Sequence, residues 1–252
     1  MGRTPIIGGN WKMNLELGEA QALATDVRHR LSAYLGAQTL VFPPSPYLLP
    51  VAERLAGSAI GLGAQDLHFE AKGAFTGAVS AAMLTSIGCK WVLLGHSERR
   101  HVFGDDDTTV AKKLRAALAA GLKPVLCIGE KLEERKNGET FRVCGRQLRT
   151  ALEGLSASQL EHMVIAYEPV WAIGTGLVAS PEQAQEVHAD IRQKVGDLLG
   201  VTYATQVRIQ YGGSVKSSSA AGLMSQEDID GLLVGGASLQ AEEFAAIVKA
   251  KG

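Results

Sequence analysis

The feature of this sequence that most constrains its fold is a repeated alternation of short apolar runs with longer amphipathic segments. The short runs predict buried β-strands, and the longer segments have the period of helices that bury one face. We expect strands near residues 5–10, 38–42, 59–64, 90–94, 123–128, 163–168, 206–211 and 230–234. The expected helices include residues 19–34, 45–56, 106–120, 138–155, 181–199 and 241–251.

Eight strands alternating with eight helical connections in 252 residues are typical of an α/β chain that forms a (β/α)8 barrel, eight parallel strands ringed by helices. A doubly wound sheet is the rival, but it requires a Gly-x-Gly-x-x-Gly turn after its first strand, where this chain has Asn10–Asn14. Without a linker or a low-complexity segment, residues 1–252 are expected to form a single domain.

Residues with known preferences for helix ends support these helices. Ser180 precedes Pro181, as an N-cap and a proline in the first turn of a helix should. Gly121 and Gly200 stand where glycine usually ends a helix.

The charge and cysteine content exclude several classes of function. The chain has 25 basic and 26 acidic residues, well mixed, and therefore no nucleic-acid or membrane-surface face. Six scattered histidines without paired Cys/His spacing argue against a metal site. Three cysteines without framework spacing favour a reducing compartment. With no signal peptide or membrane span apparent, we expect a cytoplasmic protein.

One carboxylate stands at the end of a buried strand, directly before an unusual loop. Glu168 follows the apolar run 164–167, and Pro169 ends the strand. The loop is apolar at Val170, Trp171, Ala172 and Ile173, and Gly174, Thr175 and Gly176 end it. A stiff apolar tip with glycines beyond it fits a lid that excludes water, although a capped strand with an ordinary loop has the same pattern.

Other strand ends carry polar residues that a barrel would bring to the same rim. Asn10 and Lys12 end the first strand, where Lys12 could meet a phosphate or an oxyanion, or could be a solvated lysine. His96 follows the fourth strand at the start of a short helix, whose dipole favours a neutral imidazole. A core or capping histidine is the alternative for His96.

Two glycine pairs follow the seventh and eighth strands, at residues 212–213 and 235–236. Paired glycines allow close approach of a ligand, and a helix start after them offers free N–H groups, so we interpret them as a phosphate site. Two tight turns would have the same sequence. Together, the base, imidazole, ammonium and phosphate site indicate proton transfer next to a carbonyl on a small phosphorylated substrate.

With these motifs in view, the chain resembles the triosephosphate isomerase family, whose fold is the TIM barrel. The resemblance runs through nearly the whole chain, in order, at residues 10–14 (NWKMN), 63–66 (GAQD), 73–77 (GAFTG), 95–100 (GHSERR), 127–130 (CIGE), 167–176 (YEPVWAIGTG), 211–215 (YGGSV) and 233–238 (LVGGAS).

The resemblance implies a role for each matching residue. Glu168 would be the base that interconverts dihydroxyacetone phosphate and D-glyceraldehyde 3-phosphate without a cofactor, and His96 the neutral electrophile. Lys12 and Asn10 would bind the substrate, with Glu98 supporting Lys12. The remaining matches would hold phosphate through backbone N–H groups (Gly174, Ser214, Gly235 and Gly236) or clamp over Glu168 when the lid closes (Ile173 and Leu233).

A long connection at residues 65–79 predicts assembly. Strand-to-helix links usually span about 2–6 residues, so this loop either folds back on its own barrel or enters another subunit. The resemblance favours a homodimer in which the Phe75–Thr76 tip reaches the partner's site. Ala78 stands where the family usually has an acidic residue, and Leu177 where a lysine is common. The contact would therefore depend mainly on apolar burial.

Two other functions are compatible with such a barrel. A class I aldolase needs a Schiff-base lysine at a strand end, whereas the sixth strand here ends in Glu168. An inactive barrel that serves as a binding or scaffold protein is the alternative from another class, and the intact set of polar residues argues against it.

Overall fold

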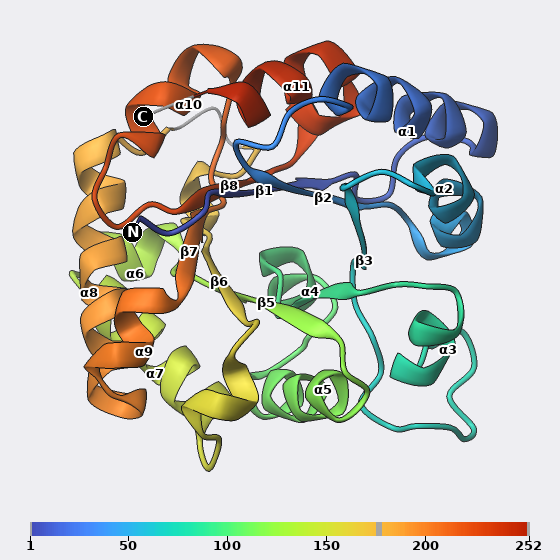
Figure 1. Ribbon diagram of the computed structural model, residues 1–252. Helices are drawn as coiled ribbons and strands as arrows, with labels where there is room; N and C mark the ends of the chain where they lie inside the picture. Colours follow the sequence, from blue (N-terminus) through green and yellow to red (C-terminus); the bar gives the residue numbers. More distant parts are fainter. Residues whose placement is uncertain (1, 175–177, 251–252) are drawn as a thin grey trace.

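The computed structural model describes residues 2–174 and 178–250, and a closed barrel of parallel strands forms its centre (Figure 1). The strands are β1 Ile6–Asn10, β2 Gln38–Phe42, β3 Gly61–Ala64, β4 Trp91–Leu94, β5 Lys123–Ile128, β6 Val164–Tyr167, β7 Arg208–Tyr211 and β8 Gly231–Val234. Each pairs with the next in sequence, and β8 pairs with β1. The predicted (β/α)8 barrel is confirmed.

Helices surround the barrel on its outside (Figure 1). The α-helices are α1 Leu17–Leu31, α2 Leu48–Leu55, α3 Ala81–Ser86, α4 Ser97–His101, α5 Asp107–Ala119, α6 Leu132–Lys136, α7 Thr140–Leu152, α8 Pro181–Leu199, α9 Val201–Gln206, α10 Ser217–Met224 and α11 Ala241–Lys249. Four short 3-10 segments are η1 Ser45–Tyr47, η2 Ala157–Leu160, η3 Val170–Ala172 and η4 Gly236–Leu239. Across residues 2–174 and 178–250, we find no helix with the length and apolarity needed to cross a bilayer.

The long helices lie where the hydrophobic period predicted them, within a few residues at each end. Ser180 caps α8 by accepting from the Gln183 N–H, with Pro181 in the first turn. Gly121 and Gly200 follow helices with φ of +72° and +93°, as expected. The helices outside the expected ranges include α3, α6 and α9, of five or six residues, and α10, of eight. They are too short for a 3.6-residue period to show.

Alternate strand residues point to opposite sides of the barrel wall and build two cores. The inner core fills the barrel and includes Phe42, Trp91, Leu93 and Leu233. The outer core lies between strands and helices, and it takes the alternate strand positions. Because both faces of every strand are covered, most strand residues are apolar, which is why the strands could be found in the sequence, although β7 also contains Arg208 and the buried Gln210.

Glycine permits the close approach that closes the barrel. A Cβ at Gly231 of β8 would lie 1.9 Å from the Ile6 carbonyl oxygen of β1, so no larger residue fits there. A buried glutamine supports the same junction, since Gln210 Nε2 donates to the carbonyls of Ile6 and Leu232 at 3.0 and 3.3 Å. The closed barrel fixes the carboxyl ends of all eight strands at one rim.

A fully buried histidine connects α8 to the barrel. His188 contacts the rings of Tyr167 and Tyr211, and its Nδ1 donates to the Asp228 carbonyl at 3.1 Å. Its Nε2 has no hydrogen-bond partner within the described residues. Burial disfavours the imidazolium and lowers the pKa of His188 to about 4.

We predict that His188 makes the fold sensitive to mild acid. The pKa of histidine is 6.5 in the unfolded chain, whereas burial lowers the pKa of His188 to about 4 in the folded chain. The stabilisation is therefore complete above pH 6.5 and falls by roughly 1 kcal/mol per pH unit as the pH drops through this window. His188→Phe keeps an aromatic ring without a titrating group, so urea unfolding from pH 7.5 to 4.5 should show a shallower pH slope. Equal slopes would contradict this.

Candidate active site

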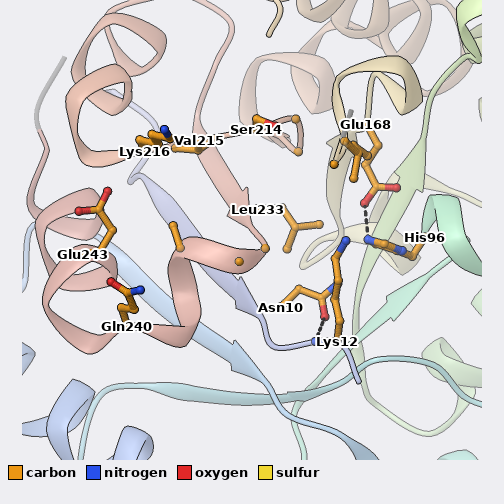
Figure 2. Close-up of a pocket in the computed structure, with 17 residues that line it drawn as sticks. Asn10, Lys12, His96, Glu168, Ser214, Val215, Lys216, Leu233, Gln240 and Glu243 are labelled. Carbon is orange, nitrogen blue, oxygen red and sulfur yellow. Dashed lines mark hydrogen bonds and ion pairs between the residues drawn. The ribbon is translucent and has the colours of Figure 1, made fainter. Parts of the chain in front are cut away.

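A cleft of about 460 Å³ opens at the rim formed by the carboxyl ends of the strands (Figure 2). It brings together residues that the sequence analysis selected from five separate segments. The selected residues that line it are Asn10, Lys12, His96, Glu168, Ile173, Gly174, Ser214, Leu233, Gly235 and Gly236. Two selected residues, Thr175 and Gly176, lie outside the described part of the chain, as does Leu177.

Glu168 follows β6 directly and is almost completely buried, with 2% of its surface exposed. Its Oε2 accepts from the Ser97 backbone N–H at 2.7 Å, at the start of α4. Its Oε1 has no hydrogen-bond partner among the described residues. Gly212 makes room for this side chain, since a Cβ there would lie 2.9 Å from Glu168 Cγ. A buried carboxylate with one uncommitted oxygen is suited to accept a proton from a bound molecule.

His96 faces that uncommitted oxygen, with Nε2 3.2 Å from Glu168 Oε1 (Figure 2). As the N-cap of α4, the imidazole accepts the Glu98 N–H at Nδ1, at 3.2 Å. An accepting Nδ1 carries no proton, so the ring is neutral and its proton is on Nε2. His96 therefore caps its helix, one of the two alternatives in the sequence analysis, and still directs an N–H donor into the cleft.

The backbone of Lys12 is held in an unusual conformation at the end of β1. Its φ of +52° lies in the left-handed region, which costs a non-glycine residue about 1–2 kcal/mol. Two hydrogen bonds maintain it: the Lys12 N–H donates to Asn10 Oδ1 at 3.0 Å, and Gln65 Nε2 donates to the Lys12 carbonyl at 2.8 Å. The strain fixes the direction in which the Lys12 side chain leaves the strand.

The Lys12 ammonium forms an ion pair with Glu98 Oε1 at 2.7 Å. The Glu98 side chain is 45% exposed, so the pair adds little to folding stability. Lys12 also runs beside the second glycine pair, because a Cβ at Gly235 would lie 3.5 Å from its Cε. The cation thus lies between the catalytic end of the cleft and the turn after β8.

The two glycine pairs differ in their surroundings: neighbouring atoms leave no room for a side chain at the first pair, whereas the second pair borders open space. A Cβ at Gly213 would lie 2.2 Å from the Tyr211 hydroxyl, so packing alone demands the first pair. No atom lies within 4 Å of a Cβ built at Gly236, which leaves that side open to a ligand. The 3-10 segment η4 begins there, and N–H groups at a helix start have no partner in the helix itself. The second pair is therefore the better anion site.

Ser214 is engaged differently from the phosphate contact that the resemblance implied. Its N–H and its hydroxyl both donate to the Ala172 carbonyl, at 3.1 and 2.8 Å. Ala172 ends η3, the apolar segment after Pro169. In this structure Ser214 therefore holds the base of the apolar loop.

A second buried carboxylate anchors the same loop. Glu130 Oε1 accepts from the Trp171 indole at 2.9 Å and the Tyr167 hydroxyl at 3.1 Å, and its carbonyl accepts from the Val170 N–H. Burial raises the pKa of Glu130, although the hydrogen bonds from Trp171 and Tyr167 act against that rise. The loop is thus fixed at its beginning by Glu130 and at Ala172 by Ser214.

In the loop at residues 65–79, the Phe75 side chain packs against another residue of the same loop and is also partly exposed to solvent. The rings of Phe75 and His68 lie 4.2 Å apart, and Phe75 is 43% exposed. Large exposed apolar side chains also stand on the neighbouring segments after β1, β3 and β4, namely Met13, Met83, Val102 and Phe103.

Several residues that shape this cleft were given no role from the sequence. Gln65 and Glu130 belong to the matching segments 63–66 and 127–130, and they act through hydrogen bonds to the backbone of Lys12 and to the side chains of Tyr167 and Trp171. Both stand within two residues of a strand end, which could have drawn attention to them. Lys216, Gln240 and Glu243 line the end of the cleft away from His96 (Figure 2). Helix starts carry such residues in any protein, so their sequence offered no signal.

The known proteins to which this chain is similar belong to one family. The family model of triosephosphate isomerase matches residues 5–251. A triosephosphate isomerase of Rhodopirellula baltica is 50% identical over 250 residues, covering 99% of this chain and 98% of its own length. Those of Carboxydothermus hydrogenoformans and Thiobacillus denitrificans are each 52% identical, over 247 and 248 residues, with 98% of both chains covered.

Proposed function

The chain belongs to the triosephosphate isomerase family, and we propose that it interconverts dihydroxyacetone phosphate and D-glyceraldehyde 3-phosphate by proton transfer at Glu168. The observation that carries this proposal is the uncommitted Oε1 of a buried carboxylate beside the Nε2–H of a neutral imidazole. These are the two groups that proton transfer next to a carbonyl requires.

In the proposed reaction the substrate lies between Glu168, His96 and Lys12. Glu168 removes a proton from one carbon to give an enediol(ate), a proton passes between the two substrate oxygens through His96, and Glu168 then returns a proton to the neighbouring carbon. The His96 Nε2–H donates to the substrate oxygen that gains charge, and the Lys12 ammonium stabilises that charge together with Asn10. Glu98 positions Lys12 through the ion pair at 2.7 Å.

The phosphate of the substrate is proposed to bind at Gly235 and Gly236, with Gly174 and Ser214 added when the loop closes. The Ser214 N–H reaches phosphate only after leaving the Ala172 carbonyl, which now accepts it at 3.1 Å. The apolar segment from Pro169 to Ile173, with Leu233 opposite, is then the lid that excludes water from Glu168.

We propose a homodimer formed through the 65–79 loop, and a cytoplasmic glycolytic and gluconeogenic role. The exposed apolar residues after β1, β3 and β4 support an interface on this side of the barrel. The cysteines Cys89, Cys127 and Cys144 are buried and unpaired, in keeping with a reducing compartment.

Glu168→Gln should retain the fold and lose most of the isomerase activity. The amide keeps the shape of the side chain but cannot accept the proton, and removing a general base typically costs about 10²- to 10⁴-fold in rate. The measurement is kcat with D-glyceraldehyde 3-phosphate in a coupled assay. The exposed Glu161→Gln variant is the control and should retain the wild-type rate. Activity of Glu168→Gln within about tenfold of wild type would show that another group is the base.

Lys12→Met should raise KM and lower kcat together, because the ammonium meets charge in both the ground state and the transition state. A phosphorylated hydroxamate that mimics the reaction intermediate should also lose affinity. Lys136→Met, which removes a charge from exposed α6, provides the comparison and should change neither constant. Unchanged KM and inhibitor affinity in Lys12→Met would mean that Lys12 is a solvated lysine.

Phe75→Asp should convert the protein to a less active monomer, whereas Leu35→Asp should not. Both side chains are large, apolar and exposed, at 43% and 84%, but only Phe75 is on the proposed interface loop. Because Ala78 supplies no charge, dimerisation of the wild type should depend weakly on salt. Light scattering with parallel assays measures both properties. A fully active wild-type monomer at micromolar concentration would refute the dimer.

A further inference from the structure

The cleft has a second end that the proposed reaction leaves without a role. The inner end contains Glu168 and His96, and the outer end is lined by Lys216, Gln240 and Glu243 (Figure 2). The proposed phosphate position at Gly235 and Gly236 belongs to the same continuous cleft. A group attached to the far side of that phosphate would therefore extend toward the outer end.

Glu243 is held rigidly at the outer end. It stands in the first turn of α11, and its two carboxylate oxygens accept from different atoms of one residue. Oε1 accepts from the Ser217 N–H at 2.7 Å, and Oε2 accepts from the Ser217 hydroxyl at 3.0 Å. Glu243 is half-buried, so these two bonds restrict a side chain that would otherwise have several rotamers.

Ser217 is the first residue of α10, whose free N–H groups and dipole would attract an anion. The Glu243 carboxylate already accepts the Ser217 N–H at this helix start and places a negative charge there. A second anion arriving at this end would meet a carboxylate in place of free N–H donors.

Among the described residues, Lys216 is the cation that lines the outer end, and it directly precedes α10. Lys216 is exposed and forms no ion pair with the described residues, so it remains available to attract an anion. Glu243 offsets that attraction with an equal and opposite charge. The charge at the outer end therefore depends on Glu243.

We propose that Glu243 is a specificity-determining residue that restricts the cleft to ligands with a single phosphate. It rejects ligands of the diphosphate class, whose second phosphate would extend from Gly235 and Gly236 toward the outer end. This inference rests on the phosphate position in the proposed function. Triose phosphates are unaffected because the rest of the molecule lies on the inner side, toward Glu168.

The test compares inorganic phosphate with inorganic pyrophosphate as ligands of the wild type and of Glu243→Gln. The glutamine carbonyl still accepts from the Ser217 N–H, and the amide can donate to its hydroxyl, so the helix cap is kept while the charge is lost. Dissociation constants are measured by calorimetry at low ionic strength without divalent cations. From the Coulomb energy of unit charges about 8 Å apart at an effective dielectric constant of about 20, pyrophosphate should bind roughly 30-fold tighter to the variant. Phosphate lies about 3 Å farther from Glu243 and should bind roughly tenfold tighter, so the ratio of the two affinities should rise about threefold.

Glu242→Gln is the matched control. Glu242 also stands in the first turn of α11, but it does not line the cleft, so its loss removes the same charge from the same helix start. Its ratio of pyrophosphate to phosphate affinity should equal that of the wild type. Adding Lys216→Gln to Glu243→Gln should reverse most of the gain, because the attracting cation is then lost as well.

The affinity ratio also separates this inference from the proposed function. An unchanged ratio in Glu243→Gln would overturn the specificity role of Glu243, even if the wild type isomerises triose phosphates. An equal gain in Glu242→Gln would overturn it too, since helix-start charge alone would then account for the effect. Absence of isomerase activity in the coupled assay would refute the proposed function, while the ratio would still test Glu243.

Discussion

The pairing of β8 with β1 is the constraint on which the rest of this structure depends. It turns eight sequential strands into a closed wall, and it requires Gly231 because a Cβ would meet the Ile6 carbonyl at 1.9 Å. Once the wall is closed, residues that are distant in the sequence share one rim. Asn10 and Glu168 are separated by most of the chain, yet they line the same cleft. Closure of the barrel thus determines which residues lie near one another at the rim. The residue types at the strand ends determine which functional groups the cleft contains.

Two buried carboxylates near this rim differ in position, because only Glu168 lines the cleft. Glu130 is completely buried, and its Oε1 accepts from Tyr167 and Trp171, so that oxygen is committed to structure. Glu168 is almost as buried, but one oxygen is held by the Ser97 N–H while the other faces the His96 imidazole. Each of these carboxylates also has one oxygen without a hydrogen-bond partner among the described residues, namely Glu130 Oε2 and Glu168 Oε1. Only Glu168 lines the cleft, where a bound molecule could give up a proton to that oxygen. Orientation and reactivity are supplied by the two oxygens of a single side chain.

Much of this fold could be predicted from sequence because each prediction depended on a local rule. Strands covered on both faces are mostly apolar, and the cap at Ser180 depends on residues three positions apart. The carboxyl-end rule then selected Glu168, His96 and Lys12 as neighbours before any distance was known. Features that depend on contacts between segments far apart in the sequence could not be predicted from such local rules. The left-handed φ of Lys12 and the double hydrogen bond between Glu243 and Ser217 arise from packing between segments far apart in the sequence.

The Ser214 N–H links the anion site to the loop after Glu168. It now donates to the Ala172 carbonyl, and one N–H cannot make a strong bond to that carbonyl and to a phosphate oxygen at the same time. A phosphate that takes this donor releases the end of η3, while Glu130 still holds the loop at Trp171 and Val170. In the proposed closure, loss of this bond would free Ala172 and Ile173, the end of the proposed lid, and Ile173 lines the cleft. The exchange of one hydrogen-bond acceptor would thus couple the arrival of phosphate to the closing of the lid over the base.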